Sequence, residues 1–218
     1  MGLDFTIIPE YLDLLIAGTW WTVALTVVSM AMSLIIGVVF AVMQLSRHRL
    51  VRWPVTFFAW LFMGTPLLLQ LFLIYFGLVQ IGLDLNAFVA GVIALSLHFA
   101  VYNSDIIRSA IIAIDDGQYE AARSLGLSQF QTMTRTIVPQ AVANVTPALG
   151  NMMIALLKES SLVSVIGVME LTLSAQRAIS DSFRSFEFYL AAAAIYYIVN
   201  LTLEQAVRIT ERRSARYR

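Results

Sequence analysis

Long segments without a charged residue constrain the fold of this chain more than any other feature. They cover residues 14–46, 53–83, 85–104, 136–157 and 188–203. The hydrocarbon core of a bilayer takes ~20 apolar residues in a helix, so the first four can each cross it, and the last can if Glu204 lies at the interface. We therefore predict an all-α membrane protein with one domain, residues 14–208, and five transmembrane helices at about residues 14–44, 53–81, 86–112, 140–168 and 187–207.

The arginines are distributed unevenly around these segments. Most of them follow the first predicted span, flank the segment after the third, or end the chain, whereas residues 1–13 carry three acids and no basic residue. Only Arg177 and Arg184 fall on the other side. The positive-inside rule then places the N-terminus outside, the C-terminus in the cytoplasm and residues 115–139 on the cytoplasmic side. Residues 1–13 are expected to lie at the outer interface, and residues 209–218 to form a basic cytoplasmic tail.

Composition argues against several classes of function. The chain is 59% hydrophobic with zero formal net charge, and its basic residues flank the spans, so nothing indicates nucleic acid binding. It has no cysteine, only two histidines, and no HExxH or Gly-x-Ser-x-Gly sequence, so we expect neither a metal site nor an intramembrane enzyme. Its one lysine, Lys158, belongs to a predicted span and not to a P-loop, so no cofactor is expected on this chain.

Residues 117–139 form a polar island between apolar segments and predict two short helices. Gly126 is placed to end the first helix. Ser128 and Gln131 have the spacing of a capping box for a second helix, which we expect Pro139 to interrupt. A short amphipathic helical hairpin on the cytoplasmic side of a membrane protein is suited to docking into a groove of a partner.

The spacing within this island resembles the EAA loop of ABC importer permeases. In that family the loop is the coupling element that inserts into a cleft of the ATPase subunit. The resemblance implies a type-1 ABC importer transmembrane domain with a cytoplasmic coupling helix in residues 115–139. The residues that carry the resemblance, and the coupling role that it implies, are Glu120, Ala121, Ala122, Gly126 and Pro139.

Three other segments resemble the polar amino-acid permeases of the same family. They are the TPLLLQLF sequence that begins at Thr65, the segment from Tyr102 to Arg108, and the KESSL sequence at Lys158 with Glu170-Leu171 beyond it. A zwitterionic substrate carries an ammonium and a carboxylate, which suits charged side chains in a cavity. The candidate substrate-binding residues are Gln70, Tyr102, Asp105, Lys158, Glu159, Ser160, Ser161 and Glu170.

Each of these residues also has a structural interpretation. Pro66 should kink the second span. Gln70 either contacts substrate or forms a hydrogen bond between helices through its side-chain amide. Asp105 is three residues from Arg108, which predicts an ion pair on one helix face, with substrate or gating contact as the alternative. Lys158 and an acid either orient a zwitterion or brace the helix as a pair.

The resemblance implies a permease subunit that moves a polar amino acid or a derivative across the bacterial inner membrane. The expected partners are a second permease (the same chain or a homologue), two ATP-binding subunits that hold ATP and Mg²⁺, and a solute-binding protein outside. An opine or cystine as substrate stays open, as does a passive channel, which would need no coupling loop.

Overall fold

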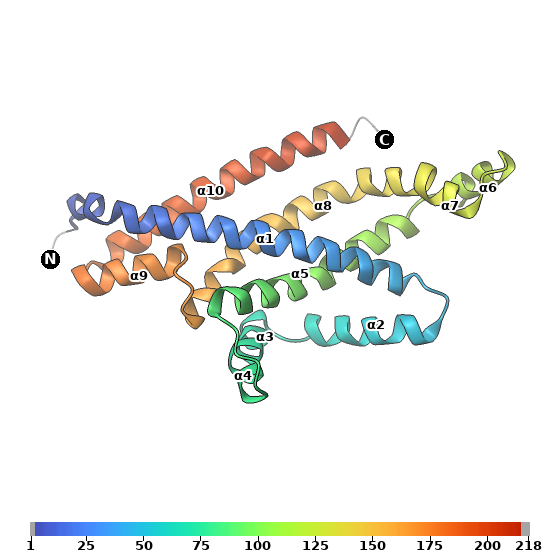
Figure 1. Ribbon diagram of the computed structural model, residues 1–218. Helices are drawn as coiled ribbons and strands as arrows, with labels where there is room; N and C mark the ends of the chain where they lie inside the picture. The colour runs from blue at the N-terminus through green and yellow to red at the C-terminus, as the bar shows by residue number, and fades with distance from the viewer. Residues whose placement is uncertain (1–2, 215–218) are drawn as a thin grey trace.

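Long helices that run roughly along one axis make up the protein in a computed structural model (Figure 1). The structure describes residues 3–214, and in that part all regular structure is helical. In chain order the helices are η1 (Phe5–Tyr11), α1 (Leu12–Gln44), α2 (Arg49–Met63), α3 (Leu67–Phe72), η2 (Leu73–Gly77), α4 (Leu78–Gln80), α5 (Ala87–Ile112), α6 (Asp116–Ser124), α7 (Gln129–Thr132), η3 (Met133–Ile137), α8 (Val138–Glu159), η4 (Ser160–Ile166), α9 (Leu171–Ser182) and α10 (Ser185–Ser214). Of these, η1 and η4 are 3₁₀-helices, and η2 and η3 are π-helices.

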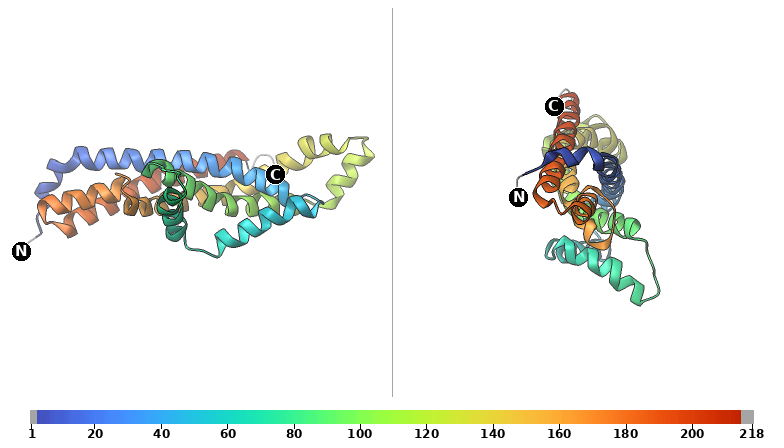
Figure 2. Two further views of the ribbon diagram at one scale, coloured as in Figure 1. Left: turned by 60° about the horizontal axis from the view of Figure 1, so that its bottom comes forward. Right: turned by 90° about the vertical axis from the view of Figure 1, so that its left-hand side faces the viewer.

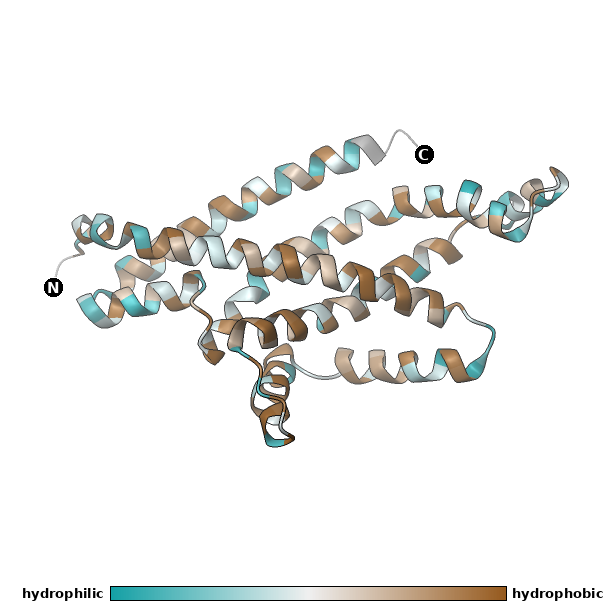
Figure 3. Ribbon diagram, in the orientation of Figure 1, coloured by the Kyte–Doolittle hydropathy of each residue, from teal (hydrophilic) through white to brown (hydrophobic). Residues whose placement is uncertain are grey.

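The two ends of the bundle differ in which segments they carry. The first described residues and α9 lie at one end, and the loop between α1 and α2 lies at the other with α6 and α7 (Figures 1 and 2). Apolar residues dominate the middle of the bundle, while the tip formed by α6 and α7 is largely polar (Figure 3). The loop after α1 and the hairpin of α6 and α7, which were both predicted to be cytoplasmic, therefore lie at the same end of the bundle.

Four helical stretches in the described residues are long and apolar enough to cross a bilayer: Phe5–Gln44, Ala87–Ile112, Gln129–Ile166 and Ser185–Arg212. A fifth is made by Arg49–Met63 and Leu67–Gln80 if this bent pair is one span. Four of the five predicted spans correspond to these single stretches, and the second corresponds to the bent pair, so the count is five if that pair crosses as one span. The basic tail predicted at 209–218 is helical to Ser214, and the rest of it lies outside the described residues.

The helices approach closely where α1 packs along α5 and α8 packs against α5 and α10. At Gly37 an added Cβ would lie 3.0 Å from the Cβ of Asn103, so only glycine lets α1 and α5 come this near. Polar side chains join the same two helices. Asn103 donates to the Ser33 hydroxyl at 3.0 Å, a type of bond that is common between membrane helices because neither group can reach water.

The second span bends far more sharply than a proline kink in one helix. The helix α2 ends at Met63, a non-helical break covers Gly64 to Pro66, and α3 leaves at 110° to α2. Pro66 starts the new helix as its N-cap, where its missing N–H costs nothing. The kink prediction is confirmed in position, but the segment from α3 to α4 projects sideways from the bundle instead of continuing across it (Figure 1).

The prediction that Pro139 interrupts a helix is wrong. One helical stretch runs from Gln129 to Ile166 through it. The turn before it is a π-helix, in which Val138 donates its N–H to the carbonyl of Met133 five residues back. Pro139 is the second residue of α8, and a proline is tolerated in the first turn of a helix. The extra residue of the π turn therefore absorbs the proline without a break.

Candidate functional site

The polar hairpin of α6 and α7 is built by local capping bonds. The Asp115 carboxylate accepts from the N–H of Gly117 at 2.8 Å and starts α6. Gly126 ends that helix with φ of +74°, a left-handed conformation that few residues other than glycine adopt. The capping box predicted from Ser128 and Gln131 is confirmed, with both of its hydrogen bonds present. The sequence therefore specifies the hairpin almost without help from the rest of the fold.

The tip of this hairpin presents large apolar side chains at the polar end of the molecule. Leu125 is 80% exposed and Phe130 is 77% exposed. Beside them, Glu120 and Ala121 are exposed on α6, whereas Ala122 is buried against the rest of the hairpin. Apolar side chains exposed beyond the apolar middle of the bundle cannot be covered by lipid tails, so they indicate a protein partner.

A central cavity of about 500 Å³ lies where α2 breaks into α3. Its walls come from the break itself, from α5 and from the last turns of α8. Two of the predicted substrate-binding residues, Tyr102 and Glu159, line it together. Glu159 is the one charged side chain among the residues that line this cavity, and its neighbours there are mostly apolar. A lone carboxylate of this kind suits a ligand that carries a positive charge.

Gln70 holds the break beside this cavity in place. Its amide nitrogen donates to the carbonyl of Phe62 at 2.7 Å and contacts the carbonyl and hydroxyl oxygens of Thr65 at 3.1 and 2.9 Å. Its amide oxygen pairs with the Nδ1 of His98 on α5 at 3.0 Å. The Phe62 carbonyl, which Pro66 leaves without its helical donor, thus has a hydrogen-bond partner. The structure bears out the interpretation that Gln70 forms a side-chain hydrogen bond between helices.

Replacing Gln70 with alanine is expected to destabilise the protein. It would leave the buried carbonyl of Phe62 without a donor, at a cost of ~1–3 kcal/mol. The check is the thermal unfolding midpoint in detergent, with Gln80→Ala as the matched control because Gln80 is exposed at the end of α4. A midpoint lowered equally by both substitutions would contradict the role given to Gln70.

The ion pair between Lys158 and an acid, which was the structural alternative to substrate contact, is absent from the described residues. Lys158 and Glu159 are both exposed, and no ion pair joins them in the described chain. Adjacent residues of a helix point in directions about 100° apart, which keeps them from facing each other. Lys158 is not among the residues that line the central cavity. Ser160 and Ser161 donate their hydroxyls to the carbonyls of Leu157 and Lys158, at 2.7 and 2.9 Å.

The ion pair predicted between Asp105 and Arg108 is also absent from the described residues. Both side chains are half-buried on α5, three residues apart. The spacing permits a pair but does not require one, since holding two long side chains together costs conformational entropy. Neither residue lines the central cavity.

Glu170 has a role that the sequence did not reveal. It is fully buried, and its carboxylate caps α9 by accepting from the N–H groups of Thr172 and Leu173 at 2.9 and 3.0 Å. It also accepts from the Tyr196 hydroxyl on α10 at 2.6 Å. It therefore lies away from the central cavity and ties α9 to α10.

The helix α9 itself was missed by the sequence analysis. It falls in a polar segment between two predicted spans, which hydropathy alone assigns to a loop. A signal was present, because Leu171, Ala175 and Ala178 recur at helical spacing after an acid that can cap. All three are buried against α1 and α10.

Comparison with known proteins gives one consistent result. Residues 33–216 match the family model described as binding-protein-dependent transport system inner membrane component. The arginine transport system permease protein ArtQ of Bacillus subtilis (strain 168) is 39% identical over 214 residues, which cover 98% of each chain. The probable amino-acid ABC transporter permease protein PatM of Vibrio harveyi is 40% identical over 206 residues, covering 93% of this chain and 92% of that protein.

Solved structures share the fold over almost the whole chain. A crystal structure of an amino acid ABC transporter with histidines superposes with a TM-score of 0.92 at 42% identity, covering 98% of this chain and 100% of the other. The MetNI methionine ABC transporter in an inward-facing conformation gives a TM-score of 0.69 at 20% identity, covering 91% of this chain and 96% of the other, which speaks for the fold alone.

Proposed function

The chain belongs to the family of binding-protein-dependent transport system inner membrane components, and we propose that it is the permease subunit of an ABC importer for polar amino acids. Its function is then transport and not catalysis. The observation that carries the proposal is the capped hairpin of α6 and α7, whose exposed Leu125 and Phe130 lie at the end of the bundle that also carries the arginine-rich loop after α1. A passive channel has no need of such a hairpin.

The proposed partners follow from the family to which the chain belongs. A second permease, either the same chain or a homologue, completes the pore with this chain. Two ATP-binding subunits hold ATP and Mg²⁺ and receive the hairpin through its exposed residues Glu120, Ala121 and Gly126. The two other residues that carry the resemblance act within the chain, because Ala122 packs inside the hairpin and Pro139 lies in the first turn of α8. A solute-binding protein delivers substrate at the end that carries α9. This order requires the N-terminus outside the inner membrane and the C-terminus in the cytoplasm.

The substrate is proposed to pass through the central cavity beside Tyr102 and Glu159. The lone carboxylate there favours an amino acid with a cationic side chain or the ammonium group of any amino acid. The test is uptake of radiolabelled amino acids into vesicles that contain the permease, its ATPase subunits and its binding protein. The proposal is supported if uptake needs ATP and if unlabelled arginine inhibits it more strongly than unlabelled glutamine or cystine does. Uptake that continues without ATP would indicate a passive channel.

The orientation gives a separate prediction. A single cysteine at Arg49 is expected to react with an impermeant thiol reagent only from the cytoplasmic side, and one at Asp181 only from outside. Both side chains are exposed, and the protein has no cysteine of its own to interfere. Labelling of intact cells and of inverted vesicles makes the comparison. The reverse pattern would overturn the orientation and the coupling role of the hairpin with it.

A further inference from the structure

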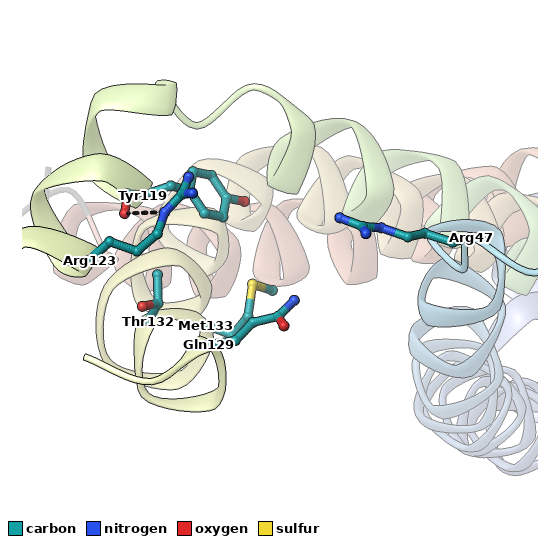
Figure 4. Close-up of a pocket in the computed structure, with 6 residues that line it drawn as sticks. All are labelled: Arg47, Tyr119, Arg123, Gln129, Thr132 and Met133. Carbon is teal, nitrogen blue, oxygen red and sulfur yellow. Dashed lines mark hydrogen bonds between the residues drawn. The ribbon is translucent and has the colours of Figure 1, made fainter. Parts of the chain in front are cut away.

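Two hollows meet at the end of the bundle that carries the hairpin. The first is a cavity of about 380 Å³ between the loop after α1 and the hairpin. Arg47 extends into it from the loop side, and Tyr119 and Arg123 face it from α6 (Figure 4). Gln129, Thr132 and Met133 complete its wall. Two cationic side chains from separate segments therefore converge on one space.

Neither guanidinium is neutralised by an acid. Within residues 3–214, ion pairs join Arg184 to Glu187 and Arg208 to Glu204, and none involves Arg47 or Arg123. The single hydrogen bond found for the two side chains is from the Nε of Arg123 to the carbonyl of Tyr119, at 3.4 Å. Tyr119 and Arg123 also line a neighbouring hollow together with Asp116 and Glu120, but neither acid forms an ion pair with Arg47 or Arg123 in the described residues. Most donors on both guanidiniums are thus available to an anion.

The second hollow is an apolar groove of about 750 Å³ that begins where the first ends. Its walls come from the last turns of α1 and α5 and the first turns of α8, and Met133 lines both hollows. Val42 and Val142 are exposed along it. These turns are the ends of three apolar spans, so the groove lies at the depth of lipid tails and the arginines at the depth of headgroups.

We propose that the two hollows together bind one anionic phospholipid, with its phosphate between Arg47 and Arg123 and an acyl chain in the groove. A free phosphate would satisfy the arginines but leave the groove empty. An apolar helix of a second copy would fill the groove but leave the arginines without an anion. A phospholipid supplies both halves in one molecule, and basic pockets at the cytoplasmic ends of membrane helices are suited to such headgroups.

Such a lipid would contact the coupling element directly. Arg47 belongs to the loop that follows a span, while Arg123 belongs to α6 of the hairpin. A phosphate held by both would fix the hairpin relative to the bundle. The inference does not depend on which amino acid is transported, and it concerns a site apart from the central cavity.

The test measures which lipids stay bound to the purified complex of the permease and its ATPase subunits by native mass spectrometry. The probes are phosphatidylglycerol and phosphatidylcholine with the same acyl chains, and inorganic phosphate as competitor. Wild-type protein is expected to retain phosphatidylglycerol over phosphatidylcholine about tenfold. Both lipids offer a phosphate, but the quaternary ammonium of phosphatidylcholine is repelled by the two guanidiniums, and tenfold corresponds to about 1.4 kcal/mol. Arg47→Gln should lower this preference, and Arg47→Gln combined with Arg123→Gln should remove it.

Matched variants separate this site from general attraction to anionic lipid. Arg52→Gln removes the same charge from an exposed arginine outside the cavity and should leave the preference unchanged. Val142→Trp fills the groove and should lower phosphatidylglycerol retention. Equal loss in the Arg47 and Arg52 variants, or displacement by inorganic phosphate alone, would overturn the proposal. So would a Val142→Trp protein that loses association between permease subunits but keeps its lipid, since the groove would then be an interface between copies.

Discussion

Replacing Gly126 with valine is expected to lower the ATP hydrolysis that the binding protein stimulates about 5- to 150-fold, with the permease still in the membrane. Gly126 has φ of +74°, and no atom lies within 4 Å of an added Cβ, so the cost is backbone strain and not crowding. Strain of this kind costs ~1–3 kcal/mol, which corresponds to a 5- to 150-fold loss of the conformation that docks. The measurement is stimulated ATPase activity of the reconstituted complex, together with uptake.

Two control variants make this prediction specific. Gly126→Asn should keep most of the stimulation, because asparagine tolerates a left-handed conformation better than other residues do. Gly82→Val places the same strain at φ of +87° in the loop after α4, away from the hairpin, and should leave coupling intact. Normal stimulation in Gly126→Val, or equal loss in Gly82→Val, would count against the role of the hairpin in coupling.

The features that the sequence predicted well are those set by local chemistry. The capping box of Ser128 and Gln131 and the stop at Gly126 need only a few neighbouring residues, and each is present as expected. The spans follow from length and hydropathy in the same way. The sequence also indicated a hydrogen-bond partner for the Phe62 carbonyl that Pro66 leaves free, because Gln70 lies one turn further along the chain.

The features that the sequence did not predict depend on packing between distant segments. A proline marks where a helix breaks, but the 110° turn between α2 and α3 is fixed by contacts with α5, including the bond from Gln70 to His98. The acid at Glu170 looked like a charge for a substrate, yet a partner 26 residues away, Tyr196, helps to bury it. Spacing alone also predicted an ion pair between Asp105 and Arg108 that does not form in the described residues.

Pro139 shows a different limit. The rule that proline ends a helix assumes regular α-helical hydrogen bonding before it. Here the preceding turn, Met133–Ile137, is a π-helix, which shifts the bonding by one residue. Nothing in the local sequence indicates that turn. The helix that results is continuous from α7 into α8, and α8 ends at the central cavity.

Replacing Glu159 with glutamine is expected to weaken transport of cationic amino acids ten- to a hundredfold in affinity. The carboxylate lines the central cavity with Tyr102 and has no ion pair with Lys158, so it is free to meet a substrate charge. Loss of one charge-assisted contact costs ~1.5–3 kcal/mol, which gives this range. The readout is the concentration dependence of uptake in vesicles for arginine and glutamine. Arginine should lose more, because its side chain adds a second positive charge.

A double-mutant cycle with Lys158→Met separates substrate contact from a structural pair. If Glu159 meets substrate, the protein with both Lys158→Met and Glu159→Gln should transport no better than Glu159→Gln alone. Glu10→Gln is the matched control, since Glu10 is exposed at the opposite end of α1 from the hairpin and loses the same charge. The Glu159→Gln complex should still hydrolyse ATP in response to the binding protein, because the hairpin is unchanged. Uptake that recovers in the double variant would mean that Glu159 only balances Lys158, and the central cavity would lose its one charged contact for substrate.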